Sequence, residues 1–353
     1  MPCSSSLKGW VGAGGGIVFN KNKSPTRIKM EVPCGQCWSC RLARSREWAT
    51  RLIKEATNWP EEQRTFITLT YNNENLPKDG SLHVEDFQNF MKALRYHFSI
   101  LKADGTRRNP KLKYFHCGEY GETCKTCNTS YIMHKESKSG KKYTGCNNFI
   151  KGLGRPHYHA ILFGVTFEDM EEFKRTKSGE LIYKSNTLDK IWDKGYCSIG
   201  QVTFESCAYV ARYIMKKVTG EQSEQHYQKP TGIDTETGEV ITTPVKPEYI
   251  TMSRNPAIAK EWANKYLTDI AKNDSVLLER KGKAFETQPP RYFLKLLEKE
   301  DPIKYELLKS QRRIKKAQNK SDNTDERSLI KERLKQIQTK NLTRNFEDYE
   351  NEN

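Results

Sequence analysis

With 353 residues the chain can bury a sizeable hydrophobic core, and its formal net charge of +16 favours a polyanionic partner, for which nucleic acid is the default. Its low mean hydropathy excludes an integral membrane protein, and its first residues lack the apolar segment of a signal peptide. We therefore expect it in a cytoplasm, where clustered cysteines act as metal ligands more often than as disulfide partners.

Three cysteines with CxxCxxC spacing, Cys34, Cys37 and Cys40, come first along the chain. Structural zinc takes four thiolate or imidazole ligands, and Cys3 is the best fourth because it also lies near the N-terminus. The spacing therefore favours a structural zinc site. Reduced cysteines in a turn and an iron–sulfur cluster remain alternatives.

Two amphipathic helices are predicted next. The first, over residues 42–57, has an apolar stripe that includes Trp48 and Leu52, and it carries Arg44 and Arg51 on its other faces. These guanidinium groups suit phosphate contacts, although a solvated face would have the same pattern. The second helix, over residues 85–94, is predicted to be core packing. Its apolar stripe consists of Phe87, Phe90, Met91 and Leu94.

His157 and His159 lie in a strand-like run that ends at Gly164. Side chains alternate along a strand, so both imidazoles face one side, while Tyr158 and its alternate neighbours face the other. On a helix the two histidines would be roughly 200° apart. The pattern predicts that both imidazoles converge on one cation. The alternative is a pair of ordinary strand histidines.

Residues 206–220 are predicted to form one helix, with Cys207 and Ala211 on its buried stripe. Tyr209 and Tyr213 fall on the opposite side, and we expect them not to be core residues. Lys216 and Lys217 lie beside them on that side. Nearby cations favour a phenolate and attract a polyanion, so the pair suits attack on a phosphodiester. Two surface tyrosines that cover apolar neighbours are the alternative.

The strand at residues 65–71, the histidine strand and the tyrosine helix resemble, in order, the three motifs of the HUH endonucleases that initiate rolling-circle replication. The stretches at residues 33–41, 114–121 and 202–206 are similar to the replication initiators of gokushovirus-type microviruses, which are single-stranded DNA bacteriophages. This resemblance extends from the N-terminus to about residue 310. It implies an α+β fold with a central antiparallel sheet flanked by helices.

The resemblance also implies an active-site Mg²⁺ or Mn²⁺ held by the two histidines and a third ligand. Glu119 is our choice for that ligand, and Glu122 is the reserve. One tyrosine would cut single-stranded DNA at the viral origin and stay attached to the 5′ phosphate, and the second would act in the next round. Arg212 stands where many relatives carry lysine, which leaves Lys216 as the better proton donor to the leaving oxygen.

The partners implied are origin DNA, a host polymerase that extends the free 3′ hydroxyl, and a host helicase. Because the chain has no Walker motif, strand separation must come from the host, from supercoiling or from an origin that is already single-stranded. The compartment implied is the cytoplasm of the bacterial host. The candidate DNA contacts are basic residues near these motifs: Arg44, Arg51, Arg155, Arg212 and Lys217.

The polar insertion at residues 122–152 carries Cys124, Cys127, His134 and Cys146, which suit a second zinc site. A mobile basic loop is the alternative reading of this insertion. We expect a cysteine-rich segment with a basic helix at residues 1–60, the nuclease-like core at 61–220, a linker or irregular excursion at 221–250, and a helical, charged region at 251–353. Two other functions stay open: a noncatalytic zinc-stabilised DNA-binding regulator, and a plasmid relaxase or transposase of the same superfamily.

Overall fold

The computed structural model describes residues 3–103, 105–124, 151–176, 179–218, 222–233, 237, 240–280 and 282–340. It divides the chain into two compact units. We call residues 49–262 the sheet unit, and residues 3–48 together with 263–340 the cysteine unit. Helix α1 (Trp38–Ala56) contributes to both. None of the described helices is long and apolar enough to cross a bilayer.

The sheet unit is built on a seven-stranded sheet in which every pairing is antiparallel. In spatial order its strands are β14 (Tyr249–Met252), β7 (Lys113–Cys124), β8 (Lys151–Phe163), β4 (Arg64–Tyr71), β11 (Gly195–Gly200), β10 (Leu181–Lys184) and β9 (Glu171–Arg175). The predicted α+β class and antiparallel sheet are confirmed, as are the strands at residues 65–71 and around the histidines.

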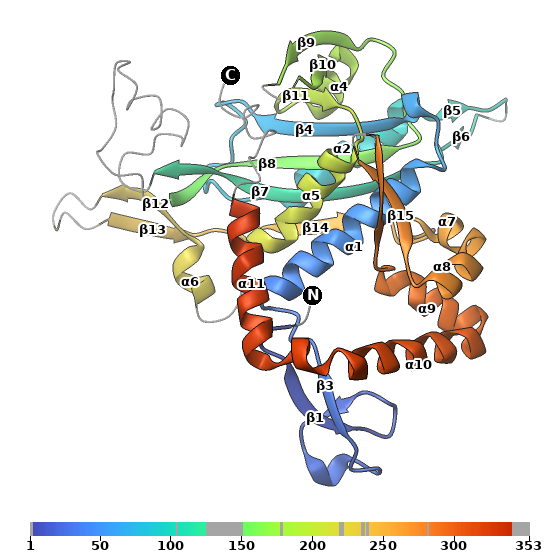
Figure 1. The fold of residues 1–353 in the computed structure, drawn as a ribbon. Coiled ribbons are helices and arrows are strands. Elements are labelled where there is room, and N and C mark those ends of the chain that lie inside the picture. The colour runs from blue at the N-terminus through green and yellow to red at the C-terminus, as the bar shows by residue number, and fades with distance from the viewer. Residues whose placement is uncertain are drawn as a thin grey trace. The chain divides into compact units, whose positions relative to one another are not determined.

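Helices cover both faces of this sheet (Figure 1). On one face, α2 (Val84–His97) and α4 (Asn186–Trp192) pack against Tyr158, Ala160 and Leu162 of β8. On the other face, where His157 and His159 point, lie α5 (Phe204–Lys216) and the last turns of α1. The predicted alternation along β8 is therefore confirmed. So is the stripe of α2, because Phe87, Phe90, Met91 and Leu94 are all buried.

A glycine is required where the histidine strand ends. Gly164 has φ of +97°, and a Cβ built on it would lie 2.1 Å from the carbonyl oxygen of Lys111. A side chain here would meet backbone that cannot move aside, in a conformation that L-residues rarely adopt. This residue therefore fixes the point at which β8 leaves the sheet.

The region at 221–250, predicted to be a linker or irregular excursion, contains regular structure, so that prediction is wrong for its described residues. It holds α6 (Gln222–His226), the paired strands β12 (Gln228–Ile233) and β13 (Val240–Pro244), and the start of β14. A two-stranded hairpin depends on backbone pairing and turn geometry, and its polar composition hides any alternating apolar pattern. The region from 251 onward likewise contains strands as well as helices.

The cysteine unit combines a small sheet with C-terminal helices. Its N-terminal sheet has the order β2 (Ile17–Val18), β1 (Leu7–Val11) and β3 (Lys29–Val32). The hairpin of β15 (Val276–Arg280) and β16 (Lys283–Thr287) follows α8 (Leu267–Asn273) and precedes α9 (Arg291–Glu300) along the chain. Helices α10 (Pro302–Gln318) and α11 (Asp325–Lys340) follow. Further short elements among the described residues include β5 (Ile100–Leu101) and β6 (Arg107–Arg108) of the sheet unit, and α7 (Lys260–Lys265).

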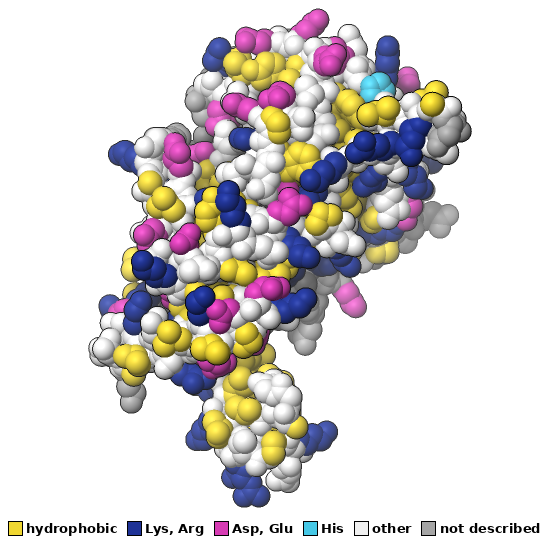
Figure 2. Space-filling model, turned by 90° about the vertical axis from the view of Figure 1, so that its right-hand side faces the viewer, with side chains coloured by type: hydrophobic (Ala, Val, Ile, Leu, Met, Phe, Trp, Pro, Cys, Tyr) yellow, Lys and Arg dark blue, Asp and Glu magenta, His cyan; other side chains and the backbone are white. Residues whose placement is uncertain are grey.

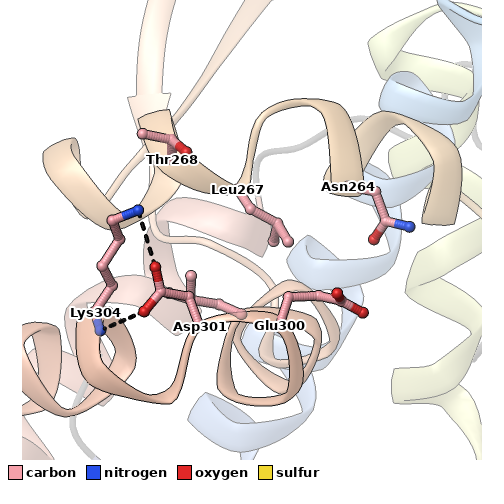
Figure 3. A pocket seen from close by; sticks show the side chains of 7 residues that line it. Asn264, Leu267, Thr268, Glu300, Asp301 and Lys304 are labelled. Carbon is pink, nitrogen blue, oxygen red and sulfur yellow. Dashed lines mark hydrogen bonds and ion pairs between the residues drawn. The ribbon is translucent and has the colours of Figure 1, made fainter.

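Figure 3 shows a pocket of about 320 Å³ within the cysteine unit. Lys304 and Asp301 meet in it, with Nζ 2.9 Å from Oδ2, and Asp301 also accepts a hydrogen bond from the backbone N–H of Lys304. Asp301 thereby caps the start of α10. The pocket's lining includes no His or Cys.

Candidate metal centre and tyrosine helix

Glu119, His157 and His159 meet on the face of the sheet that α5 covers. Glu119 pairs with His157 across β7 and β8, and Cys117 pairs with His159, so the three side chains emerge on one face. Glu119 Oε1 lies 2.8 Å from His157 Nε2 and 2.9 Å from His159 Nε2. Each of the three residues is at most 2% exposed. The structure thus brings the predicted ligand set together in a buried layer.

The outer ring nitrogens of both histidines have partners that orient the imidazoles. His157 Nδ1 lies 3.2 Å from the carbonyl oxygen of Arg155, which can only accept, so this nitrogen carries the proton. His159 Nδ1 lies 3.0 Å from Thr68 Oγ1, directly across from it on β4. These contacts leave both Nε2 atoms directed at Glu119, as in metal-binding histidines whose other nitrogen is held by a second group. Sequence reasoning missed Thr68, because only the pairing of β4 with β8 reveals it.

The three side chains could hold one divalent cation, because their ligand atoms all lie within 4.8 Å of one another. Two imidazole nitrogens and a carboxylate oxygen are ligands that divalent metal ions accept, and a bound cation would offset the buried negative charge of Glu119. The predicted Mg²⁺ or Mn²⁺ is compatible with this donor set.

Tyr209 lies directly beside this cluster. Its ring centroid is 5.3 Å from that of His159 and 6.2 Å from that of Phe66, edge-on in both cases. The guanidinium carbon of Arg212 is 5.8 Å from the centroid of the Tyr209 ring. A phenol, an imidazole layer and a guanidinium group therefore occupy one small region of the molecule.

The expectation that Tyr209 is not a core residue is wrong, because its exposed fraction is only 2%. Helix α5 packs against β7, β8 and β14 together, and Ser206, Cys207, Val210 and Ala211 are buried as well. A helix laid across three strands buries a much wider arc than a single apolar stripe. Tyr209 therefore faces the histidines from within the protein.

Several predicted residues lie outside the part of the chain whose side chains the structure describes. They are Tyr213, Lys216, Glu122, Cys124, Cys127, His134 and Cys146. The backbone of α5 includes Tyr213 and Lys216, four and seven residues after Tyr209. Their roles, and the second zinc site, stay predictions.

The sulfur atoms of Cys3, Cys34, Cys37 and Cys40 lie within 4.8 Å of one another in the cysteine unit. Strand pairing explains this, because Leu7 opposite Val32 brings the start of β1 next to the end of β3. Cys40 follows in the first turn of α1. Cys3 Sγ lies 3.5 Å from Cys34 Sγ and 3.7 Å from Cys37 Sγ. Four sulfurs at about 2.3 Å from zinc are about 3.8 Å apart, so the cluster fits a tetrahedral zinc ion.

The surroundings of these thiols favour a bound cation. Backbone N–H groups of Cys34 and Cys37 donate to Cys3 Sγ and Cys34 Sγ at 3.3 and 3.2 Å. Burial raises the pKa of Cys37, but the N–H of Cys40 and hydrogen bonds from Ser4 outweigh it and lower that pKa to about 6. Burial raises the pKa of Cys40, and repulsion from Cys37 adds to the increase. A bound Zn²⁺ would reduce this repulsion, because it offsets part of the negative charge and favours the deprotonated form of all four cysteines.

The predicted DNA contacts differ in their surroundings. Arg44 and Lys217 are exposed. Arg51 donates from Nη2 to the carbonyl oxygen of Ile258 at 2.9 Å, and Arg155 donates to Tyr71 O at 2.9 Å and to Asn73 Oδ1 at 2.7 Å. These two guanidinium groups therefore already hold loops of the sheet unit. On the face drawn in Figure 2, Lys and Arg side chains recur across the surface with acidic side chains among them.

A buried ion pair on the histidine-bearing face of the sheet is a feature that sequence reasoning missed. Lys113 Nζ on β7 lies 2.8 Å from Glu55 Oε1 on α1, and both side chains are at most 2% exposed. The Glu55 carboxylate also accepts from Trp59 Nε1 at 2.8 Å and from the N–H of Ala259. The two charged residues lie 58 positions apart, so no local pattern indicates their pairing. Their contact fixes α1 against the sheet.

Comparison with known proteins gives matches along most of the chain. A family model described as replication-associated protein ORF2/G2P matches residues 64–127 and 124–218, the span from β4 to just beyond α5. The replication-associated protein VP4 of Bdellovibrio phage phiMH2K is 28% identical over 306 residues, which cover 86% of this chain and 80% of that protein.

Two further relatives support the same grouping. The replication-associated protein ORF2 of Spiroplasma virus 4 is 28% identical, over 77% of this chain and 69% of its own length. ORF4 of Chlamydia phage 1 is 26% identical, over 77% of this chain and 55% of its own length. No solved structure matches. The resemblance that the motifs predict is thus confirmed, and the chain is similar to phage replication-associated proteins.

Proposed function

We propose that the protein initiates replication of a single-stranded DNA phage genome by cutting and rejoining one DNA strand at the viral origin. Its relatives are named replication-associated proteins of phages, which supports the general role. One observation carries the finer proposal. A tyrosine, Tyr209, packs edge-on against His159, within a cluster that also contains His157 and Glu119.

In this proposal Tyr209 or Tyr213 attacks the scissile phosphate. The bond between Tyr Oη and phosphorus forms while the bond from phosphorus to O3′ breaks, so the ester energy is kept in a 5′-phosphotyrosine. The phenol gives up its proton to water, and Lys216 is proposed to supply one to the departing O3′. A second transesterification by the free 3′ hydroxyl would reverse these changes and close a circle. Two tyrosines four residues apart on α5 would allow successive rounds at one centre.

Glu119, His157 and His159 are proposed to hold Mg²⁺ or Mn²⁺, which would stabilise charge on the nonbridging phosphate oxygens. The protein's own contribution is orientation. The carbonyl of Arg155 and the hydroxyl of Thr68 fix the two imidazoles, and the buried face of α5 fixes Tyr209. Arg212 beside the Tyr209 ring would attract the polyanion.

The remaining assignments follow from this function. Cys3, Cys34, Cys37 and Cys40 are proposed to bind structural zinc. A host polymerase would extend the 3′ hydroxyl, a host helicase would separate the strands, and the reaction would occur in the cytoplasm of the bacterial host. Arg44, Arg155 and Lys217 are proposed as phosphate contacts. A topology of the HUH type is proposed for the sheet unit.

The test is covalent attachment to origin DNA. Purified protein with Mn²⁺ should convert a labelled single-stranded origin oligonucleotide into a protein–DNA adduct, and mass spectrometry should place the nucleotide on α5. The Tyr209→Phe, Tyr213→Phe double variant should lose both cleavage and adduct, while Tyr96→Phe, an exposed tyrosine on α2, should behave as the wild type. Cleavage by the double variant would contradict the proposal. Binding without cleavage by the wild type would favour the regulator alternative.

A further inference from the structure

A shallow groove lies on the histidine-bearing face of the sheet, and β4, β11, β10 and β9 line it. Thr68 and Thr70 form its inner end, Ser198 lies in the middle, and Phe173, Lys184 and Tyr196 surround the outer part. All of these residues belong to the sheet unit. Apart from Thr68, which orients His159, none of them has a role in the transesterification described above.

Strand register connects this groove to the metal centre. Thr68 pairs with His159 on one side and with Ser198 on the other, and Thr70 pairs in the same way with His157 and Tyr196. Residues that pair directly across antiparallel strands share a face. Two rows of side chains therefore cross the sheet from the histidines to the groove, and Thr68 Oγ1 also contacts His159.

The outer part of the groove presents aromatic rings to solvent. Phe173 is 46% exposed and Tyr196 is 47% exposed, which is unusual for large rings beside a buried core. Lys184 Nζ lies 4.0 Å from the centroid of the Phe173 ring, and Lys174 Nζ lies 5.4 Å from it. Ammonium groups are thus held beside flat apolar surfaces.

Exposed rings interleaved with cations are the combination by which proteins bind single-stranded nucleic acid without reading its sequence. Bases stack on the rings, and the ammonium groups contact the phosphates between them. The cavity volume of the groove is only about 20 Å³, so it does not enclose a small molecule as a cofactor pocket does. Four strand spacings of about 4.8 Å separate β8 from β9, a span of about 19 Å that accommodates a few nucleotides.

We propose that this groove binds the single-stranded DNA that flanks the scissile phosphate, with bases stacked on Phe173 and Tyr196 and phosphates held by Lys174 and Lys184. The inference rests on the proposed function of the metal centre and deepens it. It gives the substrate a path that starts at the histidines, passes over Thr68 and Thr70 and ends on the outer strands. Stacking tolerates any base, so the groove adds affinity and positioning but not origin specificity.

The test is the affinity of the full chain for a fluorescent single-stranded oligonucleotide, measured by anisotropy. Stacking is worth about 1–3 kcal/mol per base, so the Phe173→Ala, Tyr196→Ala double variant should bind at least about tenfold more weakly. Tyr196→Trp should retain the affinity, because it keeps a stacking surface. Lys184→Gln should weaken binding and reduce its dependence on salt.

Tyr96→Ala is the matched control. Tyr96 is 64% exposed and has the guanidinium of Arg107 4.4 Å from its ring centroid, so it repeats the aromatic–cation chemistry away from the groove's lining residues. This variant should bind DNA as the wild type does. Unchanged Mn²⁺ affinity and melting temperature would show that the groove variants keep their fold and metal centre.

The outcomes separate this inference from the proposed function. Unchanged DNA affinity in the Phe173→Ala, Tyr196→Ala variant contradicts the proposal that the groove binds DNA, whatever the cleavage result. Wild-type protein that binds through the groove but forms no adduct refutes the nuclease and leaves the groove standing. If the double variant changes only self-association, measured by light scattering, the rings form a protein contact and the inference fails.

Discussion

The two candidate metal clusters are built in opposite ways. The cysteine cluster offers four half-buried thiols, most of them close in sequence, which is a closed set typical of structural zinc. The Glu119, His157 and His159 cluster offers three nearly fully buried ligands from two strands, which leaves coordination positions open, as catalytic sites do. One cluster is therefore expected to support folding and the other to support chemistry, and each can be disturbed without the other.

Removal of the cysteine-bound metal should have the largest effect. Structural zinc contributes roughly 10 kcal/mol or more to the folding of small zinc-dependent peptides. Cys37→Ser should therefore lose one zinc per chain and lower the melting temperature sharply, as seen by elemental analysis and calorimetry. Cys117→Ala, which alters a buried cysteine of β7 outside this cluster, should keep its zinc. Equal zinc content in wild type and Cys37→Ser would contradict the assignment.

Loss of a ligand from the buried cluster should abolish chemistry and leave zinc in place. Glu119→Ala removes the only carboxylate of the set, so Mn²⁺ affinity measured by calorimetry should fall by at least about 100-fold, since even outer partners of metal ligands contribute 10–100-fold. Zinc content should equal that of the wild type. A variant that loses zinc as well would show that the clusters are not independent.

Removal of the Thr68 hydroxyl, which orients His159, should weaken metal binding less than loss of a ligand does. Thr68→Val keeps the shape but removes the hydrogen bond to Nδ1, and loss of such a partner typically weakens metal binding about tenfold or more. Thr68→Ser should restore the affinity for Mn²⁺. Activity measured at saturating Mn²⁺ should recover more in Thr68→Val than in Glu119→Ala. Identical Mn²⁺ affinities in wild type and Thr68→Val would show that Thr68 does not contribute to the metal centre.

A buried histidine of the same sheet should make stability depend on pH. Burial holds the pKa of His116 well below its usual range, and the nearby His159 adds to the effect. In the unfolded chain the pKa of this imidazole is about 6.5. Below that pH the unfolded state binds a proton that the folded state does not. The free energy of unfolding should therefore decrease by up to about 1.4 kcal/mol for each unit by which the pH is lowered.

Urea denaturation between pH 7.5 and 5 would measure this decrease. His116→Gln should show a shallower slope, because the titrating group is gone. Zinc content should be followed at each pH, so that acid release of zinc from the cysteine cluster is not mistaken for protonation of His116. Equal slopes in the two proteins would assign the pH dependence to other groups.

Sequence alone determined the features that depend on local period and spacing. The strand with His157 and His159, the buried stripe of α2 and the grouping with phage replication proteins are confirmed. Each depends on residues close together along the chain, where a face or a motif can be recognised directly.

Tertiary structure decided the rest. Register placed Glu119 opposite His157 and Thr68 opposite His159, and packing across three strands buried Tyr209. The Lys113–Glu55 pair and the groove of Phe173 and Tyr196 also join distant segments. The periodicity of the sequence indicates which face of its own helix or strand a side chain lies on. Only the pairing and packing of these elements determine which residues that side chain contacts.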